Sequence, residues 1–202
     1  MLTIALPKGR IADETLDRFE KAFNEKFVFE DRKLILEKSG FKFLNVRNQD
    51  VPTYVMHGAA DLGVVGLDVL EEKEYDLIKL LDLKLGRCKV AFGLRAGEKL
   101  NFDKSKITIA TKHEKIAKKY FEQKAMAVEI IKLYGSIELA PLVGLCDCIV
   151  DIVETGETMK QNGLEVGPTI MESSAHLIAN KNSFYAKKDL IFDLKDKIEK
   201  YL

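Results

Sequence analysis

The sequence predicts an α/β fold of two lobes with mostly parallel sheets. Short apolar segments alternate with segments of helical periodicity, an order that favours parallel strands covered by helices. The pattern Gly-x-x-Asp-x-x-Val occurs twice, at 58–64 and at 144–150, each time where a helix gives way to an apolar strand. If this repeat reflects the fold, the 202 residues form two similar lobes of about 100 residues each, a feasible domain size.

The composition excludes several classes of protein. With 47% hydrophobic and 32% charged residues, the chain is expected to be globular rather than disordered or fibrous. Its 32 Lys and Arg balance its 32 Asp and Glu, so no positive net charge is present to attract nucleic acid. Apolar runs such as 148–150 are much shorter than the roughly 20 residues that span a bilayer. No secretory signal pattern is visible at the start, and we expect a cytoplasmic protein without nucleic-acid or membrane partners.

The first elements are expected to be a strand, a helix and a hairpin. Residues 2–6 form an apolar strand, and 7–10 interrupt it. The helix is indicated by four apolar residues at helical spacing: Ala12, Leu16, Phe19 and Phe23. Two β candidates, 33–37 and 41–46, flank a turn at 38–40.

A second short helix is expected to follow an N-cap at Asp50, with Pro52 in its first turn, and to end at Gly58. The rest of this half comprises a buried strand at 61–66, a short helix after Asp68 and β-like segments across 77–94. The second half repeats the alternation: a strand at 106–111, a helix at 112–124, a strand at 128–134, a helix from 136 and a strand at 148–153. β-like residues 164–178 precede an amphipathic helix that carries Leu190, Leu194, Ile198 and Tyr201.

The sharpest chemical pattern lies at the end of the apolar strand 148–153. Asp151 and Glu154 come at its carboxyl end, where open α/β sheets bind ligands, and Thr155, Gly156, Glu157 and Thr158 follow where a helix can begin. Two hydroxyls, a glycine and free backbone N–H groups suit a monophosphate. The acids suit sugar hydroxyls or a hydrated magnesium ion. A capped helix with surface acids is the alternative that motif shape alone leaves open.

A second anion site is predicted at 8–10, where Lys8 and Arg10 flank a glycine between the first strand and helix. Arg32 and Arg47 add cations beside β segments. Taken singly, these residues also fit a solvated turn and surface ion pairs. Together, two anion sites of different character on different lobes suit a ligand with phosphates at two ends.

The cysteines and histidines give little indication of a metal or catalytic site. Cys88, Cys146 and Cys148 lack the further ligands of a closed zinc site and are expected to be reduced packing residues. His57, His113 and His176 are scattered without metal-ligand spacing, so each is expected to be structural or exposed.

Five motifs, in order, carry a family resemblance. They are Ala-Leu-Pro-Lys-Gly-Arg at 5–10, Gln-Asp-Val-Pro-Thr-Tyr-Val at 49–55, Gly-Ala-Ala-Asp-Leu-Gly at 58–63, Glu-Leu-Ala-Pro-Leu at 138–142 and Asp-Ile-Val-Glu-Thr-Gly-Glu-Thr at 151–158. The chain thereby resembles the ATP phosphoribosyltransferases, the first enzymes of histidine biosynthesis, from its first strand to about Asn180.

The resemblance implies a bilobal fold similar to type II periplasmic binding proteins. It divides the chain into a first lobe, 1–89 with 172–202, and a second lobe, 90–171, that carries the phosphate loop. The implied reaction joins N1 of the ATP adenine to C1 of phosphoribosyl pyrophosphate (PRPP) and releases pyrophosphate, with Mg²⁺. The short chain implies the short form, with no C-terminal regulatory domain. That form acts with a histidyl-tRNA-synthetase-like regulatory subunit in a hetero-oligomer, and we expect a homodimer when it is alone.

The resemblance also implies residue roles. The 151–158 segment would hold the ribose and 5′-phosphate through Asp151, Glu154, Thr155, Gly156, Glu157 and Thr158. Lys8, Arg10, Arg32 and Arg47 fall where contacts to pyrophosphate or ATP are expected, as the catalytic cations. Glu138 is a candidate to accept the proton lost from the adenine amino group. No resident metal site is predicted. A solute-binding module of the same fold and a phosphoribosyltransferase for another base are the rival functions.

Overall fold

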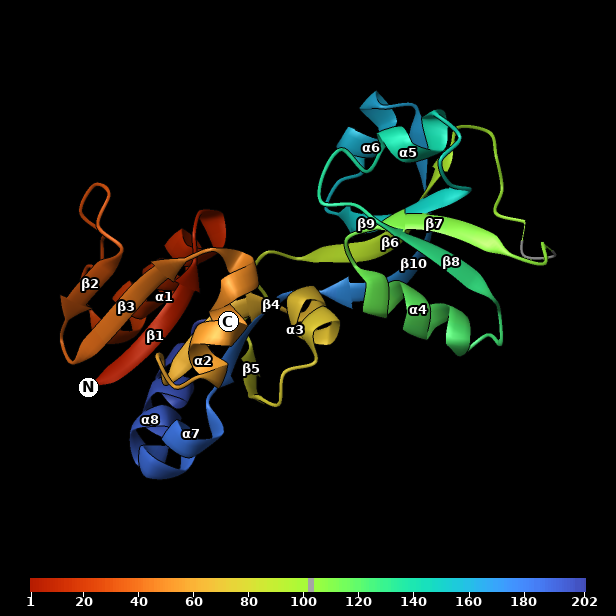
Figure 1. The fold of residues 1–202 in the computed structure, drawn as a ribbon. Coiled ribbons are helices and arrows are strands. Elements are labelled where there is room, and N and C mark those ends of the chain that lie inside the picture. The colour runs from red at the N-terminus through yellow and green to blue at the C-terminus, as the bar shows by residue number, and fades with distance from the viewer. Residues whose placement is uncertain (102–103) are drawn as a thin grey trace. The chain divides into compact units, whose positions relative to one another are not determined.

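The computed structural model describes residues 1–101 and 104–202. The chain divides into two compact units, each with its own sheet (Figure 1). Unit 1 comprises Met1–Gly86 and Ser174–Leu202, and unit 2 comprises Arg87–Ser173. The lobes expected from the sequence, 1–89 with 172–202 and 90–171, differ from these units only at their edges.

Unit 1 contains a six-stranded sheet. Its strands are β1 (Leu2–Pro7), β2 (Ile35–Lys38), β3 (Phe41–Val46), β4 (Leu62–Gly66), β5 (Ile78–Asp82) and β11 (Ala175–Ala179). They lie in the order β2-β3-β1-β4-β11-β5. β1 runs parallel to β3 and β4, whereas β11 is antiparallel to β4 and β5, and β2 is antiparallel to β3. The β2–β3 turn has Ser39 and Gly40 at φ 51° and 81°, the left-handed geometry of a two-residue hairpin.

Helices cover both faces of this sheet. They are α1 (Arg10–Phe23), α2 (Val51–Met56), α3 (Leu67–Lys73), α7 (Lys181–Ala186) and α8 (Lys188–Glu199). α1 and α8 pack residues such as Phe19 and Ile191 against Ile4 and its neighbours on one face. α2 and α3 pack Val51 and Val69 against the opposite face. Side chains of a strand alternate between faces, so the near-continuous apolar run of β1 serves both cores.

Unit 2 repeats this layered arrangement. Its strands are β6 (Cys88–Arg95), β7 (Ile107–Thr111), β8 (Val128–Lys132), β9 (Cys148–Val153) and β10 (Leu164–Ser173), in the order β10-β6-β9-β7-β8. Its helices are α4 (Glu114–Glu122), α5 (Leu139–Leu142) and α6 (Glu157–Gln161). α4 buries Phe121 on one face of the sheet, while α5 and α6 bury Ala140 and Met159 on the other.

The Gly-x-x-Asp-x-x-Val repeat corresponds to a repeated structure. Asp61, just before β4, accepts the Thr3 N–H of β1 at 2.9 Å and donates its own N–H to the Thr3 carbonyl at 2.8 Å. Asp147, just before β9, makes the same pair with Thr108 of β7, both at 2.9 Å. The sheet orders β3-β1-β4-β11-β5 and β8-β7-β9-β6-β10 correspond strand for strand. The expectation of two similar lobes is therefore confirmed.

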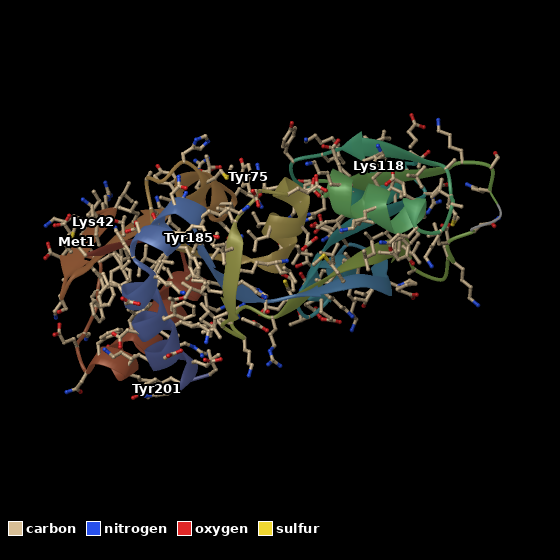
Figure 2. The ribbon with its side chains drawn as sticks, turned by 90° about the horizontal axis from the view of Figure 1, so that it is seen from below. Met1, Lys42, Tyr75, Lys118, Tyr185 and Tyr201 are labelled. Atoms are coloured by element: carbon tan, nitrogen blue, oxygen red, sulfur yellow. The ribbon has the colours of Figure 1, made fainter. Side chains whose placement is uncertain are left out.

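Some details differ from expectation. The sheets are mixed rather than mostly parallel, because β2, β6, β10 and β11 pair antiparallel with their neighbours. A short 3-10 turn, Asn48–Asp50, and helix α7 were not predicted. α5 is a single turn, and Tyr201 lies beyond α8 at the surface of unit 1 (Figure 2). Among the described residues, no helix is long and apolar enough to cross a membrane.

Candidate functional site

The loop after β9 has the geometry expected of a ligand-binding turn. Glu154 and Thr155 are exposed, and Gly156 caps α6 with φ 84°. A Cβ at Gly156 would lie 2.9 Å from the Val166 methyl group Cγ2, so both conformation and space require glycine. Thr155 Oγ1 accepts the Glu157 N–H at 3.3 Å, and Thr158 is exposed in the first turn of α6. The hydroxyls are thus presented on a tight, open turn at the carboxyl end of a buried strand.

Asp151 is held more firmly than the rest of this segment. Its side chain is 14% exposed, and its Oδ1 accepts the Ile152 N–H at 2.8 Å. Lys112 Nζ lies 3.0 Å from the same oxygen, and His113 Nε2 lies 3.8 Å from it. Sequence reasoning did not select Lys112 or His113 as site residues. The signal that could have found them is their position directly after β7, the parallel neighbour of β9.

The four predicted cations gather at one edge of the unit 1 sheet. Pro7 of β1 pairs with Val46 of β3, so Lys8 and Arg47 each follow the carboxyl end of adjacent parallel strands. Arg10 begins α1 in the same turn, where its Nε lies 3.8 Å from Glu14. Arg32 precedes β2, which is antiparallel to β3 and therefore starts at this same edge.

The turn that holds Lys8 and Arg10 is shaped by Gly9. Gly9 adopts φ 94° at the N-terminus of α1, a conformation that L side chains rarely adopt, and no side chain caps this helix. The Lys8 N–H donates to the Val46 carbonyl at 2.8 Å, which anchors the turn to β3. Lys8, Arg10, Arg32 and Arg47 are all exposed. Lys8, Arg32 and Arg47 therefore reach solvent from an anchored edge, and Arg10 lies in the same turn beside Glu14.

Glu138 and the thiols complete the set of predicted residues. Glu138 is half-buried just before α5, in the segment that leaves the carboxyl end of β8. Cys146 and Cys148 are buried and free, and burial raises the pKa of Cys148 to about 12, so this thiol stays protonated. Among residues 1–101 and 104–202, no group of three or more His, Cys, Asp or Glu is placed to hold a metal ion.

Comparison with known proteins decides the family. The family model for ATP phosphoribosyltransferase matches residues 47–200. The ATP phosphoribosyltransferase of Wolinella succinogenes is 68% identical over 200 residues, which cover 99% of this chain and 97% of the relative. The chain belongs to the ATP phosphoribosyltransferase family. The ATP phosphoribosyltransferase of Helicobacter hepaticus is 59% identical over 202 residues, which cover 100% of this chain and 98% of the relative.

Solved structures agree with this assignment. The ATP phosphoribosyltransferase (HisG:HisZ) complex from Thermotoga maritima contains a chain with a TM-score of 0.85 and 35% identity, over 99% of this chain and 98% of that one. The periplasmic aliphatic sulphonate binding protein SsuA from Escherichia coli shares the fold alone, with a TM-score of 0.64 at 12% identity over 98% of this chain and 67% of that chain. The expected bilobal fold is confirmed. As an ATP phosphoribosyltransferase, the chain is a pentosyltransferase that catalyses the first step of histidine biosynthesis.

Proposed function

We propose that the chain transfers the phosphoribosyl group of PRPP to N1 of ATP and releases pyrophosphate. The observation that carries this proposal is the chemical contrast between two carboxyl edges. The unit 1 edge presents only cations from the predicted set, Lys8, Arg10, Arg32 and Arg47. The unit 2 edge presents carboxylates, hydroxyls and a glycine turn in the 151–158 segment. Polyphosphates suit the first edge, and a sugar monophosphate suits the second.

The mechanism follows from charge. Breaking the bond between C1 and pyrophosphate leaves an oxocarbenium-like sugar and a highly charged leaving group. Arg32 and Arg47 would stabilise that leaving group through paired guanidinium hydrogen bonds, which strengthen as its charge develops. Lys8 and Arg10 would bind phosphates of either substrate. No nucleophilic side chain is required, because adenine N1 attacks C1 directly. Glu138 is the candidate acceptor for the proton of the 6-amino group.

The 151–158 segment would position the sugar. Asp151 and Glu154 would accept hydrogen bonds from the ribose hydroxyls, while Thr155, Gly156, Glu157 and Thr158 would surround the 5′-phosphate. Mg²⁺ suits this donor set, since it is commonly held by substrate phosphates, water and one or two carboxylates. Asp151 and Glu154 would hold it through water, and when bound it would neutralise charge on the diphosphate. Their role toward the sugar does not depend on that ion.

Assembly is proposed by analogy with the relative from Thermotoga maritima, whose structure is named a HisG:HisZ complex. We expect this chain to act with a histidyl-tRNA-synthetase-like regulatory subunit in a hetero-oligomer, and to form a homodimer when alone. Its substrates are cytoplasmic metabolites, which supports a cytoplasmic location.

The test is a mass-spectrometric assay of ATP, PRPP and Mg²⁺ with and without the regulatory subunit. We expect phosphoribosyl-ATP and pyrophosphate in equal amounts, and no product when another purine nucleotide replaces ATP. A solute-binding module of the same fold would bind ligand without turnover. Absence of the product with the subunit present would contradict the proposed reaction.

A further inference from the structure

The turn between β7 and α4 occupies a distinctive place in unit 2. The strand correspondence equates β7 with β1, so the turn at Thr111, Lys112 and His113 is the counterpart of the turn at Lys8 in unit 1. Both turns follow the carboxyl end of a central parallel strand. Open α/β sheets bind ligands at this edge. The β7–α4 turn is therefore placed to take part in the site that the 151–158 segment forms.

The contacts of Asp151 connect it to this turn. Alternation along β9 places Asp151 on the same face as Ile149 and Val153, which pack in an apolar cluster. A carboxylate that is only 14% exposed beside such a cluster needs partners. Lys112 Nζ at 3.0 Å and His113 Nε2 at 3.8 Å both approach its Oδ1. The turn thus provides the two side chains that surround this carboxylate.

The turn is locked to β9. Thr111 is fully buried, and its Oγ1 donates to the Val150 carbonyl at 2.6 Å. The same oxygen accepts the His113 N–H at 2.8 Å, just before α4 begins. The His113 side chain is 2% exposed. Its ring is therefore confined next to Asp151, on a turn that cannot shift without breaking the link to β9.

The charge of Asp151 gives a second reason to include Lys112 in the site. A carboxylate next to a phosphate-binding turn repels the phosphate unless a cation neutralises it. Lys112 provides that cation, and its side chain is 38% exposed, so its aliphatic part lies over the protein while the ammonium group reaches Asp151. We infer that Lys112 and His113 are positioning residues for PRPP: both confine the Asp151 carboxylate so that it faces the sugar hydroxyls, and Lys112 cancels its charge. This inference rests on the proposed role of Asp151.

The first experiment measures PRPP and ATP binding to the full-length chain by calorimetry. Lys112→Met and His113→Phe should each weaken PRPP binding by about tenfold, the lower end of losses seen when a supporting partner is removed, and leave ATP binding unchanged. His113→Gln, which keeps an N–H donor, should restore most of the affinity. Lys118→Met is the matched control, because Lys118 lies at the surface on α4, where it pairs with Glu122 of the same helix (Figure 2). If His113→Phe does not fold, Lys112→Met alone carries the test.

A double-mutant cycle with Asp151→Asn separates positioning from direct binding. If Lys112 and His113 act through Asp151, adding either substitution to Asp151→Asn should cause no further loss of PRPP affinity. Losses that multiply, or single variants that bind PRPP normally while Asp151→Asn does not, would overturn the inference. Normal PRPP binding by Asp151→Asn would also overturn it, but would leave the proposed reaction standing if the wild-type chain still turns over.

Discussion

Thr158 is the residue at which the proposed phosphate loop is most directly tested. Its side chain is exposed in the first turn of α6, behind the glycine that shapes the loop. Its role therefore depends on the hydroxyl group rather than on packing.

Thr158→Ala should weaken PRPP binding by about 1–3 kcal/mol, the usual contribution of a hydrogen bond to a charged group. Calorimetry on the folded variant measures the loss, with Thr169→Ala on the exposed side of β10 as the matched control. Unchanged PRPP affinity in Thr158→Ala would remove this residue from the site.

Substitution of Arg47 tests the proposed pyrophosphate site at the carboxyl edge of the unit 1 sheet. It is exposed directly after β3, and its carbonyl accepts the Asp50 N–H, so its backbone is held while its guanidinium remains available. Arg47→Ala should lower kcat/KM on the order of 100-fold, because the lost donor acts chiefly as pyrophosphate departs.

Steady-state kinetics with the regulatory subunit present measure this effect. Arg32→Ala is expected to behave alike, whereas Lys42→Ala on β3, the strand that precedes Arg47, should retain full activity, since Lys42 pairs with Glu37. Near-normal turnover in both arginine variants would leave Lys8 and Arg10 as the pyrophosphate contacts.

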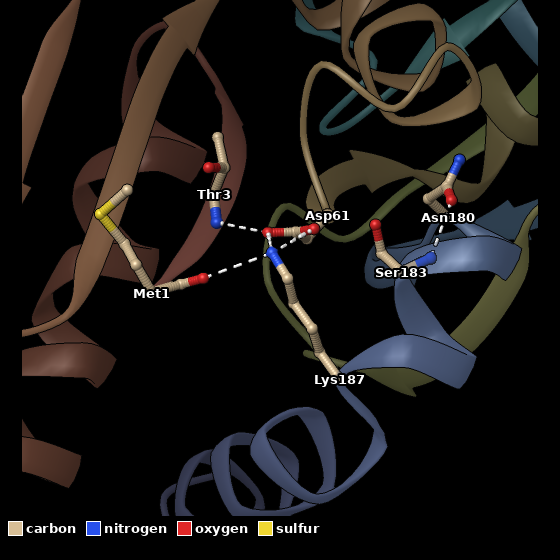
Figure 3. A network of polar contacts seen from close by, with 6 residues as sticks. All are labelled: Met1, Thr3, Asp61, Asn180, Ser183 and Lys187. Atoms are coloured by element: carbon tan, nitrogen blue, oxygen red, sulfur yellow. Dashed lines mark hydrogen bonds and ion pairs between the residues drawn. The ribbon is translucent and has the colours of Figure 1, made fainter.

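At the scale of elements, Asp61 joins the chain's two ends. Figure 3 shows its carboxylate accepting from the Thr3 N–H and from Lys187 Nζ, at 2.7 and 2.8 Å for the latter. Lys187 also donates to the Met1 carbonyl at 3.4 Å. Asn180 caps α7 by accepting the Ser183 N–H at 3.0 Å, which fixes the turn that brings Lys187 to this point. The network fastens the C-terminal helices to β1 and β4.

This network predicts that the fold becomes less stable as the pH falls into the acid range. Burial acts to raise the pKa of Asp61, but the hydrogen bonds from Lys187, Thr3 and Ser183 outweigh it and hold the pKa below its usual value. A lowered carboxyl pKa stabilises the fold above the unfolded value of about 3.9, and this contribution is lost as the pH falls through the folded value.

Asp61→Asn should therefore lower the free energy of unfolding by about 1–3 kcal/mol at pH 7, a figure kept modest because Lys187 is partly exposed. Urea titrations at pH 7 and pH 3 measure it, and the difference from wild type should shrink at the lower pH. A constant difference at both values would contradict the ionic origin of the effect.

The contact between β4 and α2 offers a packing test. A Cβ at Gly63 would lie 2.7 Å from Val55 Cγ2 and 2.8 Å from Val51 Cγ1, and both valines have short, stiff side chains. Gly63→Ala should destabilise the fold by about 1–3 kcal/mol through overpacking. Thermal unfolding measures this, and Gly135→Ala, where a Cβ meets nothing within 4 Å, is the control. Equal thermal unfolding midpoints for the two variants would contradict the prediction and show that α2 shifts to accommodate the added methyl group.

At the scale of the whole molecule, the question is where regulation resides. The described residues form two units, and each already carries one of the proposed substrate-binding edges. Allosteric control requires an effector site distinct from the substrates. The relative from Thermotoga maritima is named a HisG:HisZ complex, so we expect histidine inhibition of this chain to depend on a second polypeptide of that kind.

Co-elution with a histidyl-tRNA-synthetase-like subunit, followed by histidine titration of the assay, checks this expectation. We expect a complex at micromolar concentration, with inhibition by histidine only in its presence. Inhibition of the isolated chain at a site separate from ATP and PRPP would contradict it, as would the lack of a complex.

Local patterns in the sequence determined most of the helices and strands, the two lobes and the candidate binding turns. Apolar runs and helical spacing located most elements, and β3 and β9 occur at the predicted bounds, because burial on a strand or helix imposes a short-range period on the sequence. The Gly-x-x-Asp-x-x-Val repeat identified two similar lobes because each Asp must satisfy the same backbone N–H at the start of a neighbouring strand. The motifs at 8–10 and 151–158 stand out for a related reason. A tight turn directly after a buried strand accepts few residue types, so glycine and polar residues at that point are visible in the sequence.

Only the tertiary structure decided which distant residues meet. Strand pairing brings Arg32 to the edge that holds Lys8 and Arg47, and it places Lys112 and His113 on Asp151, from a turn that the sequence marked merely as a helix start. The antiparallel pairings of β11 with β4 and of β6 with β9 likewise join segments far apart in sequence, which no local period records. Pairing energies act between residues far apart in sequence, so a single sequence shows which residues are suited to a site, and the fold decides which of them share it.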